Sequence, residues 1–265
     1  MKRKRKANVL EPRPLYVDGG RGVRLVLEGG SLRLTRASCA DVRVPLKRVS
    51  RVCLRGEVQL SSSLLAGCCE AGIAVVVQES SGKVRGAVSP SVGELPTALG
   101  DRLAMCADSA VARAACRLYF EGAERAAMRL ALDELAASVD AEEKPSKVRR
   151  QLTARNAGFS NRQAERYARK ITESICRAAA IDCLSTRGVD PGRVRRETGM
   201  DLIGALYLAC QWSLEPLLAE AATVKLWEGP RRELVKHLER GNPEVKRAAA
   251  RWIRGLEHRL GEALG

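Results

Sequence analysis

The stretch LRGEVQLSSSLLAGCCEAGIAVVV, residues 54–77, predicts a strand, a short helix and a second strand in direct succession. Three consecutive serines, residues 61–63, offer a hydroxyl cap for the helix, which we expect to end between Gly67 and Gly72. Residues 73–77 form an unbroken, Val-rich apolar run, which is typical of a strand covered on both faces. This part of the chain therefore predicts a β-rich domain that holds one buried helix.

A hairpin is expected upstream of this stretch. Residues 23–27 and 32–35 alternate apolar and polar side chains, and Gly29-Gly30 between them supply the positive φ of a tight turn. Further strands are expected at residues 42–46 and 51–54, and residues 84–88 belong to a second hairpin that closes the domain.

The composition changes after residues 90–96, a segment that begins and ends with proline and predicts a linker. Beyond it, Ala, Arg and Leu recur at helical spacing, and one helix face can hold Leu103, Ala107, Ala110, Ala114 and Leu118. We expect a loop over the polar segment 138–160 and helices at about residues 161–184, 199–227, 230–240 and 243–262. The predicted fold class is α+β, with a small β-rich domain over residues 10–92 followed by a larger all-α domain over residues 97–265.

The charge balance indicates a polyanionic partner. Lys and Arg number 46 against 31 Asp and Glu, which gives a formal net charge of +15. Cations that neutralise phosphates release condensed counterions, so such an excess favours nucleic acid. Residues 1–9 begin with a basic run and are expected to form a basic arm. We expect no membrane partner, because no apolar run approaches the roughly 20 residues that span a bilayer.

Nine cysteines are scattered along the chain without a Cys-x-x-Cys pair that could start a zinc site. Most lie among Ala, Leu and Val, where a free Cys acts as a small core residue. Free thiols are typical of a reducing, cytoplasmic setting. The low aromatic content, 3%, points weakly to a high-temperature source.

Residues across the β-rich part match a known pattern of glycine turns and buried strand positions. They are Pro45-Leu46, Gly56, Val58, Ser61, Leu64, Gly72-Ile73, residues 75–77, Gly82 and Arg85-Gly86. In order and spacing they resemble the N-terminal β-domain of the CRISPR spacer-acquisition integrase family, the Cas-one type. The helical part is also similar to that family at residues 102–130 and at Gly188-Val189-Asp190-Pro191, which looks like its Gly-Leu-Asp-Pro turn. The resemblance implies that the β-rich domain pairs two subunits and that the helical domain carries DNA.

In this family a Glu, a His and an Asp hold a divalent cation for phosphodiester chemistry. Counting from Asp190 without gaps, the family His falls at Glu197. The family Asp falls at Ala209 and the following acid at Trp212, while Pro216 lies on a proline common in the family. The resemblance therefore implies that the metal ligands are replaced, and we expect no cofactor.

A gapped alignment leaves a second possibility open. Gly122-Ala123-Glu124 imitates the Gly-x-Glu pattern around the family Glu, and Asp201 can take the place of the family Asp. Glu124, Glu197 and Asp201 then offer three carboxylates for catalysis with Mg²⁺ or Mn²⁺. The two histidines, His237 and His258, each adjoin a basic residue and are expected to be solvated rather than ligands.

Basic residues of the helical domain are the candidate nucleic-acid contacts. Arg162, Arg166 and Arg169 recur at a spacing that places them on one helix face, as a phosphate-binding stripe or as a solvated, ion-paired surface. The full candidate set is Arg149, Arg150, Arg162, Arg166, Arg169, Lys170, Arg193, Arg195 and Arg196.

The leading hypothesis is a DNA-binding Cas-one-like protein of CRISPR adaptation, that is, of spacer acquisition, with impaired catalysis. Its expected partners are duplex or branched DNA, a second copy of the chain bound through the β-rich domain, and other adaptation proteins such as the Cas-two type. Two alternatives are an active, divergent metal-dependent DNA endonuclease or integrase, and a non-catalytic structural or nucleic-acid-binding partner unrelated to CRISPR.

Overall fold

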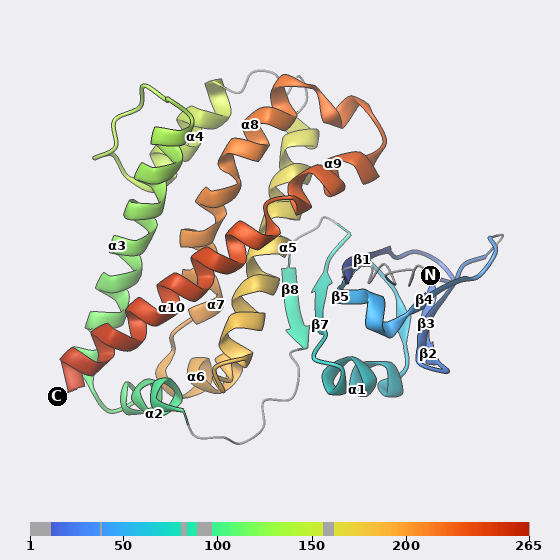
Figure 1. The fold of residues 1–265 in the computed structure, drawn as a ribbon, viewed down its shortest axis with the longest axis horizontal. Coiled ribbons are helices and arrows are strands. Elements are labelled where there is room, and N and C mark those ends of the chain that lie inside the picture. Colours follow the sequence, from blue (N-terminus) through green and yellow to red (C-terminus); the bar gives the residue numbers. More distant parts are fainter. Residues whose placement is uncertain (1–11, 38, 81–83, 89–96, 156–161, 265) are drawn as a thin grey trace, which may run out of the picture. The chain divides into compact units, whose positions relative to one another are not determined.

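Two four-stranded sheets and a short helix make up the first unit of the chain, Met1–Ser91 (Figure 1). A helical second unit, Val92–Gly265, follows, which confirms the predicted α+β class. The computed structural model describes residues 12–37, 39–80, 84–88, 97–155 and 162–264, without the side chains of residues 154, 155 and 162. The predicted basic arm over residues 1–9 and the linker over residues 90–96 lie outside the described residues.

The first sheet has the strand order β1-β5-β7-β8. Its strands are β1 (Arg13–Asp18), β5 (Val49–Arg55), β7 (Ala74–Gln78) and β8 (Val84–Val88). Strands β1 and β7 both run parallel to β5, and β8 pairs antiparallel with β7. Three successive residues of β7, Ala74, Val75 and Val76, are buried. Since successive strand residues point to opposite faces, both faces of β7 are covered, as its apolar run predicted.

The second sheet has the order β4-β3-β2-β6. Its strands are β2 (Arg24–Glu28), β3 (Ser31–Thr35), β4 (Val42–Pro45), which leads into the short 3-10 helix η1 (Leu46–Arg48), and β6 (Gln59–Leu60). The predicted hairpin is confirmed: β2 and β3 pair antiparallel, and Gly29 and Gly30 between them have φ of 54° and 71°.

Helix α1 (Ser62–Glu70) begins at the predicted serine cap, where the Ser61 hydroxyl accepts a hydrogen bond from the Leu64 N–H. The helix buries Leu64 and Cys68 in the core of the first unit. A Cβ at Gly67 would meet the end of the Leu27 side chain, so α1 packs closely against β2 at this glycine.

The second unit is a packed set of helices in which α10 contacts α3 and α5, and α7 also contacts both (Figure 1). The elements are α2 (Ala98–Met105), α3 (Ala110–Glu134), α4 (Pro145–Arg155), α5 (Arg162–Ser185), α6 (Pro191–Thr198), α7 (Leu202–Cys210), η2 (Gln211–Leu214), α8 (Glu215–Thr223), η3 (Leu226–Glu228), α9 (Arg231–Glu239) and α10 (Asn242–Leu264).

Helix α4 corrects the prediction of a loop over residues 138–160. Most of its residues are polar, but Val148 and Leu152 are spaced one turn apart and are buried against Met128 of α3 and Trp212 of η2. Two apolar positions are thus enough to fix this helix, because the neighbouring elements supply the rest of its contacts.

Leu118 also differs from its predicted position. The helical conformation is interrupted between α2 and α3, and the Ser109 hydroxyl caps the start of α3. The two helices therefore do not share one continuous face. The buried side of α3 carries Cys116 and Phe120, and Leu118 is 63% exposed.

The region predicted as one helix over residues 199–227 consists of α7, η2 and α8. By length and composition alone the stretch Leu202–Thr223 could cross a membrane, although Gln211, Glu215 and Glu220 interrupt its apolar residues. However, Leu206, Trp212 and Leu218 of this stretch are buried in the helical unit. The hydropathy of the stretch therefore reflects its place in the core.

The cysteines are free, and most are buried, as predicted for core residues. The prediction that His237 is solvated is wrong, because its side chain is buried and its Nε2 lies 3.0 Å from the Leu217 carbonyl oxygen. His258 is exposed, as predicted, beside Glu262.

Glycine at position 255 makes a close contact between α10 and α3 possible. The Tyr119 hydroxyl donates a 2.6 Å hydrogen bond to the Trp252 carbonyl, and a Cβ at Gly255 would lie 2.3 Å from the Tyr119 hydroxyl oxygen. We expect Gly255→Ala to lower the free energy of unfolding by about 1–3 kcal/mol, because this contact must open. Urea unfolding of the full chain measures the change.

The matched control for that substitution is Gly122→Ala on α3, where a Cβ meets nothing within 4 Å. Alanine is the better helix former by up to about 1 kcal/mol, so this variant should be as stable as the parent or more stable. Equal stability of the two variants would contradict the packing argument.

Candidate functional site: a buried ion network

Glu215 places a carboxylate in the core of the helical unit. Its side chain is 1% exposed, and its Oε1 accepts a 2.9 Å hydrogen bond from Arg169 Nη1. Arg169 also donates to Glu165 Oε1 at 2.8 Å and to Thr153 Oγ1 at 2.7 Å. One guanidinium therefore joins α5, α4 and α8 through three acceptors.

The guanidinium of Arg149 also lies near Glu215. Arg149 Nη2 is 3.3 Å from Glu124 Oε1, and Arg149 Nε is 4.0 Å from Glu215 Oε1. The guanidinium carbon of Arg149 also lies 4.9 Å from the centroid of the fully buried Trp212 ring. This stacking is a cation–π contact. Glu124, Arg149, Glu165, Arg169 and Glu215 form what we call the buried ion network.

Burial and charge oppose each other at Glu124. Burial raises the pKa of its carboxyl, and the Arg149 guanidinium partly offsets that rise because it favours the ionised form. Arg149 is thus the cation that opposes the effect of burial on the pKa of Glu124.

The sequence-predicted carboxylates Glu124, Glu197 and Asp201 have separate surroundings. Glu197 lies on the surface of α6 and pairs with Arg193 at 2.7 Å. Asp201 caps α7, where its Oδ1 accepts from the Gly204 N–H at 2.8 Å. In the part of the chain that the structure describes, no three His, Cys, Asp or Glu side chains are grouped so that they could hold a metal ion.

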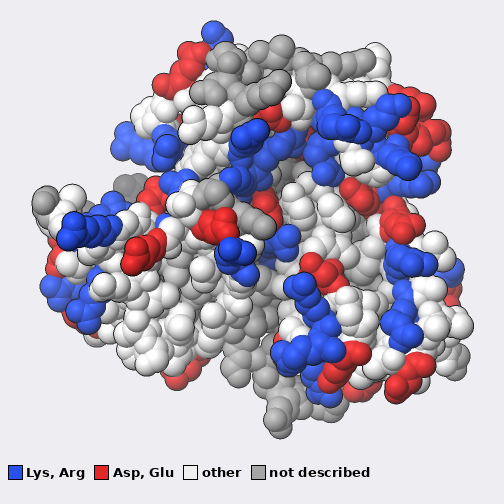
Figure 2. Space-filling view, turned by 180° about the vertical axis from the view of Figure 1, so that it is seen from behind, with Lys and Arg blue, Asp and Glu red and all other residues white. Residues whose placement is uncertain are grey.

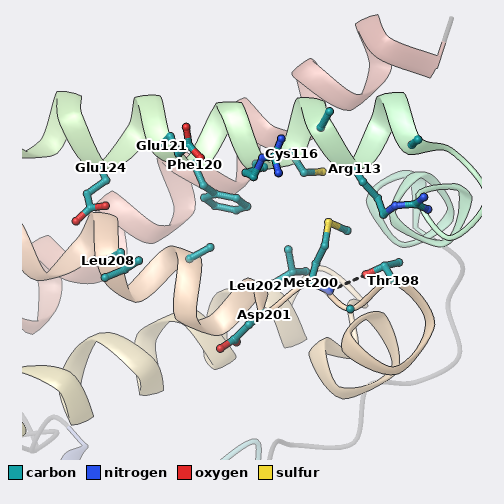
Figure 3. Close-up of a pocket in the computed structure, with 15 residues that line it drawn as sticks. Arg113, Cys116, Phe120, Glu121, Glu124, Thr198, Met200, Asp201, Leu202 and Leu208 are labelled. Carbon is teal, nitrogen blue, oxygen red and sulfur yellow. Dashed lines mark hydrogen bonds between the residues drawn. The ribbon is translucent and has the colours of Figure 1, made fainter. Parts of the chain in front are cut away.

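A groove of about 540 Å³ lies between α3 and the α6–α7 connection. Figure 3 shows Glu124 near one end of this groove and Arg113 near the other, with Phe120 and Met200 between them. Asp201 also lines the groove, but Glu197 does not. The groove therefore brings two of the three candidate carboxylates to one opening without assembling a ligand set.

The sequence profile of the family described as CRISPR associated protein Cas1 matches residues 15–173, which is more than half of the chain. The chain belongs to the Cas1 family. No curated protein matches this Cas1-family chain by sequence.

Solved structures share the fold of this Cas1-family chain. A Cas1 protein of Thermotoga maritima, TM1797, has a TM-score of 0.67 at 13% identity, covering 92% of this chain and 97% of that one. A casposase bound to its integration product has a TM-score of 0.60 at 10% identity, with 88% and 82% covered. TtCas1 in a complex with DNA has a TM-score of 0.52 at 16% identity, with 94% and 91% covered.

The positions that the count from Asp190 assigns to the family's metal ligands do not fit a divalent cation. Ala209 and Trp212 are fully buried and offer no oxygen ligand. Glu197, at the position of the family His, is engaged with Arg193 on the surface. Glu124 is held by Arg149, and the profile match itself ends at residue 173, upstream of positions 197, 209 and 212.

The candidate nucleic-acid contacts fall into two groups. The guanidinium groups of Arg149 and Arg169 are taken up by internal ion pairs, so we leave them out of any DNA-binding surface. Lys170 is half-buried, and the side chain of Arg162 lies outside the described residues. The exposed members are Arg150, Arg166, Arg193, Arg195 and Arg196. Figure 2 shows that Lys and Arg gather in several groups over one face, with acidic residues beside them.

The buried ion network was not predicted from the sequence. Its members are far apart in the chain, and each residue taken alone is typical of a solvated helix surface. The one local signal was Glu215, an acidic residue inside the apolar stretch Leu202–Thr223.

Glu215→Ala should lower the free energy of unfolding by about 3–5 kcal/mol, because it leaves the Arg169 guanidinium half-buried without its main carboxylate. Glu197→Ala removes an exposed carboxylate from an i,i+4 pair and should leave stability unchanged. Chemical denaturation of both variants measures the difference. Equal stabilities would show that the buried network does not hold the helices together.

Proposed function

We propose that this chain is a DNA-binding Cas1-family protein of CRISPR adaptation that lacks the metal-dependent chemistry of integrases. The observation that supports this most is the surroundings of the expected metal-ligand positions. Ala209 and Trp212 pack into the core, and Glu124 is bound to Arg149. A carboxylate held by a guanidinium inside a protein is a poor ligand, because metal binding must first break that pair.

Charge supports the DNA-binding part of the proposal. The net charge of +15 favours contact with phosphates, and Arg150, Arg166, Arg195 and Arg196 are exposed without an ion pair among the described residues. Two structures of the same fold, the casposase bound to its integration product and TtCas1 in its complex with DNA, support it further.

The proposal extends to the assembly. A chain of a Cas6-RT-Cas1–Cas2 complex contains a part with this fold, with a TM-score of 0.58 at 10% identity over 96% of this chain and 35% of that one. We propose that a Cas2-type protein is a partner of this chain and that two copies of the chain form a homodimer through the β-rich unit. We also propose a cytoplasmic location and no membrane partner. Light scattering of the purified chain tests the dimer.

The decisive experiment combines binding and chemistry on the same DNA. Linear and branched duplexes are incubated with the full chain in Mg²⁺, Mn²⁺ or EDTA, and both mobility shifts and strand-transfer or cleavage products are measured. We expect tight, salt-sensitive binding and no products in any of the three conditions. Metal-dependent products that are lost in Glu197→Ala would instead support an active enzyme that uses Glu124, Glu197 and Asp201.

Arg195→Ala with Arg196→Ala should weaken DNA binding and flatten its salt dependence. The slope of log affinity against log salt should fall by about 1 for each phosphate that is no longer neutralised. Arg129→Ala on α3 is the control, because this arginine is also exposed but pairs with Glu142 at 2.7 Å. Binding that does not depend on salt would favour a structural partner with no phosphate-reading surface.

A further inference from the structure

Glu124 has a single ion-pair partner in the described part of the chain, the guanidinium of Arg149. Its side chain is 18% exposed, so most of its carboxylate is shielded from water. Glu215 is buried further and keeps Arg169 as a second partner. Among the described residues, Glu124 therefore has Arg149 as its one ion-pair partner, whereas Glu215 lies beside two arginines.

Arg149 leaves part of the hydrogen-bonding capacity of Glu124 and Glu215 unused. Its contact with Glu215 is 4.0 Å, too long for a hydrogen bond. Arg149 Nε and Glu215 Oε2 are both buried, and neither has a hydrogen-bond partner among the described residues. The carboxylates of Glu124 and Glu215 could therefore accept more hydrogen bonds or metal contacts than the Arg149 guanidinium supplies.

The helix that carries Arg149 is held at the network by few other contacts. Of the α4 residues with described side chains, Val148 and Leu152 are buried, and the rest are polar or partly exposed. Arg149 stacks on Trp212 and reaches Glu124 on α3. Arg149 therefore adds a charged contact to the apolar packing of Val148 and Leu152 that holds α4 against α3 and η2.

We propose that Arg149 is the resident cation of this site, which takes the place of a divalent ion by pairing with Glu124 beside Glu215 and by holding α4 over them. The helical unit is then stable without a metal ion. This inference rests on the proposed function in one respect, the loss of the metal site. It concerns the folded chain alone, so it is tested without DNA, and the DNA assays above test the proposed function separately.

Thermal unfolding of the full chain in EDTA, MgCl₂ and MnCl₂ is the first test. The unsubstituted chain should unfold at the same temperature in all three conditions. A rise in Tm with Mn²⁺ that disappears in Glu124→Gln would overturn the proposal, because Glu124 would then already bind a metal ion.

Arg149→Met is the informative variant, because a methionine retains the apolar contact with Trp212 and removes only the charge and its hydrogen bond. We expect Tm to fall by about 5–10 °C, because Glu124 loses its cation. Adding MnCl₂ should recover part of that loss, since a divalent ion can bind the carboxylates that the guanidinium has released.

Two further variants separate charge from packing. Arg149→Lys should keep part of the parent stability without any added metal. Arg149→Met combined with Glu124→Gln should be more stable than Arg149→Met alone and should not respond to Mn²⁺. A double variant no more stable than Arg149→Met, or an Arg149→Met protein indifferent to Mn²⁺, would show that Arg149 is a packing residue and not a resident cation.

Discussion

The buried carboxylate of Glu215 sets the arrangement of the helical unit. Taking a carboxylate out of water costs several kcal/mol, so cations must lie beside it in the folded chain. Arg169 on α5 supplies one cation and Arg149 on α4 supplies the other. Each of these binds a further acid, Glu165 or Glu124. One buried charge thus fixes the relative positions of α3, α4, α5 and α8.

Trp212 is the apolar counterpart of this network. It is fully buried and packs with Met128 and Leu132 of α3 and with Val148 and Leu152 of α4. By the count from Asp190, it stands where relatives in the family have an acid. A large aromatic ring at that position fills the space and offers its face to Arg149. In this helical unit, apolar packing around Trp212 and internal ion pairs thus lie side by side.

Local patterns predicted the local features of the fold. The Val-rich run of β7, the glycine pair of the β2–β3 hairpin and the serine cap of α1 each depend on neighbours in sequence, and each is confirmed. Helix α4 was missed because its buried positions are recognisable only once Trp212 and Met128 are beside them. The buried ion network was missed for the same reason, since a charged residue looks alike on a helix surface and in a core until its partner is known. Glu215 within an apolar stretch could have signalled a buried charge, but no spacing rule identifies arginines 46 and 66 residues away.

The strand order of the first sheet affects the sequence in which its strands can pair during synthesis. Among the described residues β1 pairs with β5 alone, so residues 13–18 can form this ladder only once residues 49–55 have been synthesised. The β2–β3 hairpin, by contrast, joins neighbouring residues and can close while the chain is still emerging. Pairing of strands that are far apart in sequence is slow, because the entropy of the intervening loop is lost before the strands make stabilising contacts. In the nascent chain the backbone N–H and C=O groups of β1 thus lack their ladder partners until β5 has been made, and unpaired strand edges favour misassociation.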